Sequence, residues 1–158
     1  MQRVLNGKTA VITGASRGIG AATARRFAAE GANLVLTART LEQHPTLPGS
    51  LNETAQVCRG LGADVLVIQA DLGDEESRLR IIPMALEKFG TINILVNNAV
   101  AAIYKALDQY ALKHRRLMTE INVQAPLDLI QQSLPSMIAI HIYLVHFVFH
   151  ASFLQIFL

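Results

Sequence analysis

The chain has 158 residues, of which 51% are hydrophobic and 16% are charged, and its formal net charge is +2 at pH 7. That length suits one domain with a core of ordinary size, and the composition excludes a disordered chain. The small net charge, with no basic stripe interleaved with aromatic residues, excludes nucleic acid as the expected partner.

The single cysteine, Cys58, excludes an internal disulfide. This fits a reducing compartment, the cytoplasm or an organelle matrix. No apolar run precedes Asn6 and Lys8, so we expect no secretory signal.

A first predicted strand over residues 9–13 leads into a glycine-rich turn and then into a helical run over residues 21–30. The turn reads Gly14-Ala-Ser-Arg-Gly18-Ile-Gly20. The order of strand, turn and helix brings free backbone N–H groups and a helix N-terminus to one point, which predicts a phosphate-binding site. Gly14 allows a sharp exit from the strand, Gly18 allows close approach of a pyrophosphate, and Gly20 allows close packing of the helix on the sheet.

Three further motifs follow the turn in a recognisable order. They are Asp71-Leu72 after the third apolar run, Asn97-Asn98-Ala99 after the fourth, and Asn122 within Glu120-Ile-Asn-Val. Together with Thr13 and the glycine turn, this set resembles the short-chain dehydrogenase/reductase family over residues 6 to about 137. The resemblance implies an α/β fold, the first part of a Rossmann-type doubly wound parallel sheet. We expect an incomplete sheet with the strand order 3-2-1-4 and helices on both faces, a three-layer α/β/α arrangement.

The glycine turn and the family motifs together give a set of candidate cofactor contacts. They are Gly14, Ser16, Arg17, Gly18, Ile19, Gly20, Arg39, Asp71, Leu72, Asn98 and Ala99. The end of the second predicted strand, residues 34–38, bears on which dinucleotide is bound, because an acid there favours NAD and a cation accommodates the 2′-phosphate of NADP. The chain has Arg39 at this point, and Arg17 could hold the same phosphate by charge-assisted hydrogen bonds. NADP(H) is the expected cofactor, and NAD is the alternative.

The other predicted elements are strands at residues 64–70 and 92–96 and helices at residues 51–61, 75–89 and 117–137. Ser50 and Glu53 have the spacing of a capping box at the start of the first of these helices. Asp71 and Asp74 precede the second, so they could cap that helix as well as contact the cofactor. The two functions are compatible.

Hydride transfer to a carbonyl needs a proton donor near the carbonyl oxygen. The family supplies a tyrosine, a lysine four residues later, and a serine. No Tyr-x-x-x-Lys occurs here, because the three tyrosines at 104, 110 and 143 are followed at that spacing by Asp108, His114 and Phe147. A substitute acid made from Tyr110 and His114 is disfavoured, because both precede the helix of Asn122. The resemblance makes Asn122 the one candidate catalytic residue, as the asparagine that bends its helix and holds a proton-relay water. The alternative is a structural hydrogen bond.

The end of the chain differs in composition from the rest. No formal charge occurs from Leu129 onward, and four of the six phenylalanines lie in the last twelve residues. We therefore divide the chain into a partial dinucleotide-binding domain, residues 1–136, and an atypical apolar tail, residues 137–158. The favoured interpretation is a truncated family domain with a foreign tail. The alternatives are a membrane anchor, which lacks flanking Lys or Arg, and a stand-in for the fifth strand within residues 140–149. His146 and His150 have no acid or thiolate nearby, so no metal site is expected.

The resemblance implies an NADP(H)-dependent oxidoreductase acting on a small-molecule carbonyl or secondary alcohol. The chain itself keeps most of the dinucleotide site and lacks the proton-transfer residues, so whether it is an enzyme stays open. The alternative is a non-catalytic dinucleotide-binding or interaction fragment. The resemblance also implies that it could pair with further copies through the Asn122 helix. Without the strands that follow in the family, we expect the fourth strand to be an unpaired edge and the stability to be poor.

Overall fold

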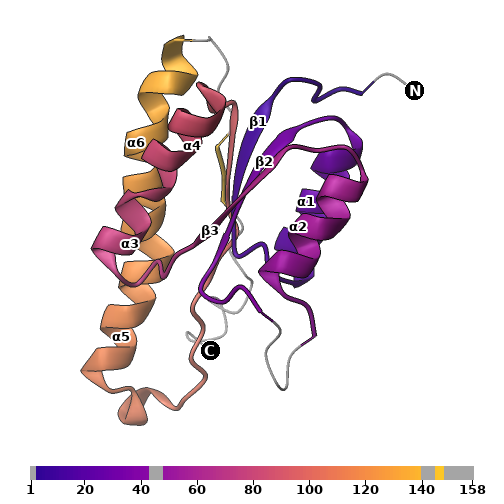
Figure 1. The fold of residues 1–158 in the computed structure, drawn as a ribbon. Coiled ribbons are helices and arrows are strands. Elements are labelled where there is room, and N and C mark those ends of the chain that lie inside the picture. Colours follow the sequence, from indigo (N-terminus) through magenta and orange to yellow (C-terminus); the bar gives the residue numbers. More distant parts are fainter. Residues whose placement is uncertain (1–2, 43–47, 140–144, 148–158) are drawn as a thin grey trace.

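The computed structural model describes residues 3–42, 48–139 and 145–147. Its central layer is a parallel sheet of five strands in the order β3-β2-β1-β4-β5 (Figure 1). The strands are β1 (Thr9–Thr13), β2 (Asn33–Ala38), β3 (Val65–Gln69), β4 (Ile94–Asn97) and β5 (Val145–Phe147). The predicted order of the first four strands, 3-2-1-4, is confirmed.

Helices cover both faces of the sheet, as the sequence predicted (Figure 1). One face carries α1 (Gly18–Ala29) and α2 (Leu51–Gly60), and the other carries α3 (Glu75–Leu79), α4 (Ile81–Phe89), α5 (Leu112–Thr119) and α6 (Ala125–Ala139). Two short elements complete the chain order: a 3-10 turn η1 (Leu107–Gln109) between β4 and α5, and a π-helical turn η2 (Glu120–Gln124) that joins α5 to α6. The result is a three-layer α/β/α sandwich.

The two faces of the sheet bury different kinds of side chain. On the α1 and α2 side the core is rich in alanine, with Ala10, Ala15, Ala24, Ala28, Ala32 and Ala55 among its members. On the other side it contains larger residues, including Ile81, Ile82, Ile92, Leu129 and Met137. All five residues of β1 are buried, as expected for a central strand of a parallel sheet that helices cover on both faces.

The fourth strand is not an edge of the sheet, and this part of the expectation was wrong. β5 pairs in parallel with β4, with Leu95 opposite Val145 and Asn97 opposite Phe147. β5 thus pairs with N–H and C=O groups that β4 would otherwise leave open. It falls within the segment 140–149 that the sequence offered as a stand-in. Most of the tail for which the sequence offered a membrane anchor, residues 140–144 and 148–158 with His150, lies outside the described residues. Among the helices of the described ranges, none is long and apolar enough to cross a lipid bilayer.

The predicted helix starts are confirmed at two caps. The Ser50 hydroxyl accepts a hydrogen bond from the Glu53 backbone at 3.0 Å, and the Asp74 carboxylate accepts one from the Ser77 backbone at 2.8 Å. Such caps satisfy N–H groups that have no partner inside the helix.

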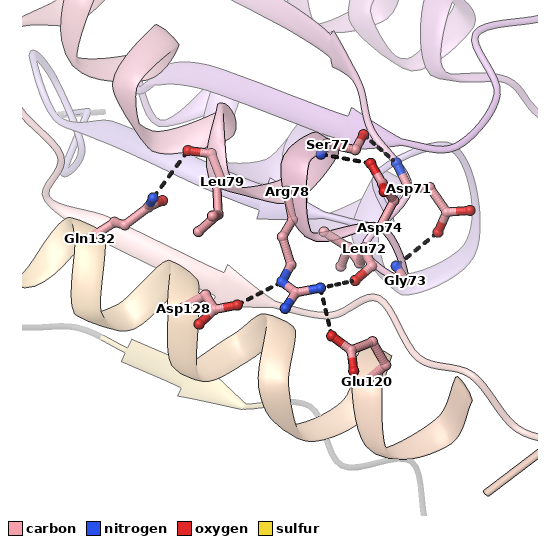
Figure 2. Close-up of polar contacts among 10 residues, drawn as sticks. All are labelled: Asp71, Leu72, Gly73, Asp74, Ser77, Arg78, Leu79, Glu120, Asp128 and Gln132. Carbon is pink, nitrogen blue, oxygen red and sulfur yellow. Dashed lines mark hydrogen bonds and ion pairs between the residues drawn. The ribbon is translucent and has the colours of Figure 1, made fainter. Parts of the chain in front are cut away.

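The predicted helix ending at Phe89 is divided at Arg80 into α3 and α4. Pro83 has no N–H to donate to the carbonyl of Leu79. That carbonyl instead accepts a bond from the Gln132 side chain of α6 at 3.1 Å (Figure 2). The division thus ties the α3–α4 junction to α6.

Candidate functional site

A cavity of about 900 Å³ lies beyond the carboxyl ends of β1 to β4. All the predicted cofactor contacts except Gly20 line it. Open α/β sheets bind ligands at this end, where the strand order reverses on either side of the first strand. The motifs that lie far apart in the sequence are therefore brought to one place, around a space large enough for a small organic ligand.

The glycine turn forms one wall of the cavity. Gly14 and Gly18 have φ angles of 66° and 56°, a region that favours glycine. A Cβ added at Gly18 would meet no atom within 4 Å, so the turn is open on that side. At Gly20 it would lie 2.4 Å from the Gly14 carbonyl oxygen and 2.6 Å from Asn98 Nδ2. Gly20 thus allows α1 to approach the turn and the end of β4, and lies beneath the cavity wall.

Thr13 and Asn98 join the ends of β1 and β4. The Thr13 hydroxyl accepts hydrogen bonds from the backbone N–H groups of Asn98 and Ala99, each at 3.0 Å, and donates to the carbonyl of Val96 at 3.3 Å. The Asn98 side chain donates to the carbonyl of Thr13 at 2.8 Å and to that of Gly14 at 3.2 Å. These bonds fix the glycine turn relative to the Asn98–Ala99 segment.

Two arginines lie at the cavity, as predicted. Arg17 is the N-cap residue of α1, and its Nε lies 3.5 Å from the Ser16 hydroxyl. Its Nη1 is buried and has no hydrogen-bond partner within the described residues, and the same holds for Thr37 Oγ1. Arg39 is exposed directly after β2. Buried donors of this kind are expected to have a partner, so this part of the cavity suits a ligand with several acceptor oxygens.

The segment after β3 forms a second wall. Asp71 is exposed and Leu72 is buried. The Asp71 carboxylate accepts from the Gly73 backbone at 2.9 Å, and the Asp71 backbone donates to the Ser77 hydroxyl at 3.0 Å (Figure 2). The carbonyl of Leu72 accepts a bond from Arg78 Nη1 at 3.3 Å. The segment is therefore held by α3 on its far side while Asp71 and Leu72 face the cavity.

Asn122 lies in the π-helical turn η2 and does not line the cavity. Its Oδ1 accepts from the backbone N–H of Ala101, and its Nδ2 donates to the carbonyl of the same residue, both at 2.9 Å. Ala101, Leu117 and Ile121 do line the cavity. Asn122 thus fixes the wall that follows Ala99. The π-helical turn interrupts the regular α-helix at this point, and a catalytic role for Asn122 stays a prediction.

Tyr110 and His114 do not line the cavity. The Tyr110 hydroxyl donates to the carbonyl of Ile103 at 2.8 Å, and the ring of His114 stands edge-on to it with centroids 5.8 Å apart. The pair therefore packs against the segment before α5, which agrees with the low weight that the sequence gave it as a substitute acid.

Several cavity residues were not predicted from the sequence: Thr37, Ala38, Thr40, Ala70, Val100, Ala101, Leu117 and Ile121. Most of them lie at the end of a strand or within four residues after it, so the rule that ligands bind at the carboxyl ends of strands could have found them. Leu117 and Ile121 are an apolar pair at helical spacing. Only their tertiary position shows that they close the cavity.

The described residues outside the cavity show no further reactive site. Burial raises the pKa of the Cys58 thiol, which lies in the α1 and α2 core. Such a thiol is inert rather than nucleophilic. Across the described ranges, no three His, Cys, Asp or Glu residues gather as metal ligands would.

Known proteins are similar to this chain in sequence and in architecture. A family model described as short chain dehydrogenase matches residues 8–142. The chain belongs to this family of oxidoreductases. It is 42% identical over 120 residues to a bovine (Bos taurus) protein named hydroxysteroid dehydrogenase-like protein 2. That match covers 76% of this chain and 29% of the relative, so the chain spans less than a third of the relative's length.

Solved structures extend the match to the fold. A metagenomic short-chain oxidoreductase in complex with NADP has a TM-score of 0.82 and 30% identity, over 90% of this chain and 62% of that one. A carveol dehydrogenase from Mycobacterium avium in complex with NAD has a TM-score of 0.75 and 27% identity, over 88% of this chain and 52% of that one. The Rossmann-type arrangement is therefore that of the family.

Proposed function

We propose that this chain binds a nicotinamide dinucleotide in the cavity at the carboxyl ends of β1 to β4, and that it prefers NADP(H) to NAD(H). The observation that carries the proposal is the open face of the glycine turn beside the buried, unpartnered Nη1 of Arg17. The related structures with NADP and with NAD support a dinucleotide. Arg39 after β2 supports the phosphorylated one.

Each part of the cavity suits one part of such a ligand. The backbone N–H groups of residues 18–20 and the N-terminus of the 12-residue helix α1 would bind the pyrophosphate. Arg17 and Arg39 would hold the 2′-phosphate. Asp71 and Leu72 would contact the adenine, and Asn98 and Ala99 the ribose on the nicotinamide side. Thr13 holds Asn98 and Ala99 in place for that contact.

A bound dinucleotide supplies the hydride that the family transfers to or from a carbonyl or secondary alcohol. The residues of this chain provide binding and orientation, but no Tyr-x-x-x-Lys pair is present in the 158 residues. The Tyr110 hydroxyl is bonded to the carbonyl of Ile103 outside the cavity. We therefore propose that these 158 residues bind the dinucleotide without turning over a substrate. The competing function is oxidoreduction of a small carbonyl compound by the same chain.

The binding proposal is tested by titrating the purified chain with NADPH and with NADH, following nicotinamide fluorescence and thermal stability. We expect NADPH to bind at least about tenfold more tightly, because charge-assisted hydrogen bonds contribute about 1.5–3 kcal/mol. Arg39→Ala should remove most of the preference. Arg25→Ala, at an exposed position on α1 with the same change in net charge, is the control and should keep it. Equal affinities in the wild type, or a preference that survives Arg39→Ala, would contradict the assignment.

Turnover is tested separately with a panel of small aldehydes and ketones. We expect the purified chain to oxidise no NADPH in a substrate-dependent way. Substrate-dependent oxidation would refute the non-catalytic part of the proposal, whereas the binding part depends only on the titration.

A further inference from the structure

Arg78 is a charged side chain in the layer between the sheet and α6, and only 4% of it is exposed. Its Nε donates to Asp128 Oδ2 at 2.6 Å, and its Nη1 lies 2.7 Å from Glu120 Oε1 and donates to the carbonyl of Leu72 at 3.3 Å (Figure 2). One guanidinium therefore joins three segments: the loop after β3, the π-helical turn η2, and α6.

Stability alone is a weak reason for this arrangement. Burial opposes the charge of Arg78, but its hydrogen bonds and charge pairs with Asp128 and Glu120 outweigh that effect and raise its pKa. The desolvation of a buried ion pair offsets much of its attraction, so an apolar replacement is often as stable. A rigid fork with several donors instead fixes geometry, because it binds its acceptors in set directions.

The segments that Arg78 joins are walls of the cavity. Leu72 lines it on one side, and Leu117 and Ile121 line it on the other. They meet at Gly73, where an added Cβ would lie 3.4 Å from Leu117 Cδ1 and 3.8 Å from Ile121 Cδ1. The loop and the helix thus touch without a spacer, and a shift of one changes the shape of the cavity.

The connection continues to the wall after β4. Glu120 is the first residue of η2, and Asn122 in the same turn grips both backbone groups of Ala101. The contacts therefore run without a gap from Leu72 through Arg78 and Glu120 to η2 and Ala101. Both ends of this chain of contacts line the cavity.

We propose that Arg78 is a positioning residue for dinucleotide binding. Its guanidinium holds the Leu72 wall in place by bridging the carbonyl of Leu72 to the carboxylates of Asp128 and Glu120. The inference rests on the proposed function, in which Leu72 contacts the adenine. Arg78 itself touches no ligand. Its loss is expected to weaken contacts to the adenosine half. Contacts to the nicotinamide half should stay nearly unchanged, because Thr13 still binds the Asn98 and Ala99 backbone when Arg78 is lost.

The test uses three ligands and two variants of the full chain. The ligands are NADPH, adenosine 2′,5′-bisphosphate and reduced nicotinamide mononucleotide, with dissociation constants from calorimetry or, for weak binding, from NMR titration. The first variant is Arg78→Met. The second, Arg78→Met with Asp128→Leu, removes the carboxylate that would lose its main partner, and keeps the test valid where Arg78→Met alone folds poorly.

Arg26→Met is the matched control. Arg26 also pairs with a carboxylate at 2.6 Å, Glu30, but its side chain is 75% exposed. We expect this variant to bind all three ligands as the wild type does.

We expect both Arg78 variants to bind NADPH and adenosine 2′,5′-bisphosphate about tenfold more weakly, the usual order of coupling between linked sites. Binding of the mononucleotide should change less than twofold. Amide hydrogen exchange of residues 71–73 should become faster in the unliganded variants, while that of β1 stays as in the wild type. Weakening of both halves by equal factors, or unchanged binding of the bisphosphate, would overturn the proposal. A wild-type chain that binds no dinucleotide would instead refute the proposed function, and the positioning role with it.

Discussion

The walls of the cavity are built in two different ways. The glycine turn is shaped by the backbone and by missing side chains, since Gly20 leaves room for the Gly14 carbonyl and Asn98. The wall around Leu72 and Ala101 is held by polar side chains of α3, η2 and α6, chiefly Arg78 and Asn122. The first wall is local in the sequence, and the second joins residues that are far apart. Substitutions should therefore act by steric conflict at the first wall and by loss of specific contacts at the second.

The layers behind the walls differ in the same way. Small alanines let α1 and α2 lie close to the sheet, and the ion pair on this side, Arg26 with Glu30, is at the surface. On the opposite side, the core contains larger aliphatic residues, and the buried side chain of Arg78 pairs with Asp128 and Glu120. A close-packed backbone needs few directional contacts to stay in place, whereas a more open layer of side chains leaves room for a polar network.

The largest effect is expected at the glycine turn, the wall that the backbone shapes. Gly20→Ala would place a Cβ 2.4 Å from the Gly14 carbonyl oxygen, so the turn must shift. We expect a loss of about 3 kcal/mol in the free energy of unfolding, at the upper end for overpacked sites, and loss of NADPH binding. Urea unfolding and calorimetry measure the two effects.

Gly60→Ala is the control for this substitution. A Cβ there would meet no atom within 4 Å, and Gly60 lies in the last turn of α2. We expect it to be neutral or to stabilise the chain by up to about 1 kcal/mol. If both variants lost similar stability, the steric account of the turn would be wrong.

A smaller effect is expected at the wall around Leu72 and Ala101, which polar side chains hold in place. Asn122→Ala removes two hydrogen bonds of 2.9 Å to Ala101. We expect a loss of about 1–2 kcal/mol in the free energy of unfolding, because each bond contributes about 0.5–1.5 kcal/mol. Gln124→Ala, at an exposed position of the same turn, should change it by less than about 0.5 kcal/mol. Equal effects of the two substitutions would show that Asn122 does not hold this wall.

The smallest effect concerns the surface ion pair of the alanine-rich layer. A hydrogen bond from the Val4 backbone, together with the bond and charge of Arg26, lowers the pKa of Glu30, although desolvation partly opposes this. A lowered pKa means that the contribution to stability is present above the ordinary value of 4.5 and is lost as the pH falls through the lowered value.

Glu30→Gln should therefore be slightly less stable than the wild type at neutral pH, and the difference should vanish in acid. Urea midpoints of both proteins across the acidic range measure this. A difference that stays constant with pH would show that the carboxylate charge contributes nothing.

The contrast between the walls also explains how much the sequence predicted. The glycine turn, the caps at Ser50 and Asp74 and the strand order depend on local residue types and on the family motifs, and they were predicted. Arg78 was not, because its partner Asp128 is 50 positions away and the sequence gives no sign that they meet. The favoured expectation that β4 would be an unpaired edge was wrong, because β5 pairs with it. No motif indicates this pairing, which depends on backbone groups that the rest of the fold leaves open.

The most direct test of the central claim is an NMR titration of the ¹⁵N-labelled chain with NADPH. The account predicts saturable shifts of the amides of Gly18, Ile19, Leu72 and Asn98, on both walls of the cavity. A second cleft of about 650 Å³, lined by Arg115 and Arg116 and also by Arg78, Glu120 and Asp128, is the contrasting location on the chain. Shifts confined to that cleft, or no saturable shift from the folded chain, would contradict the account.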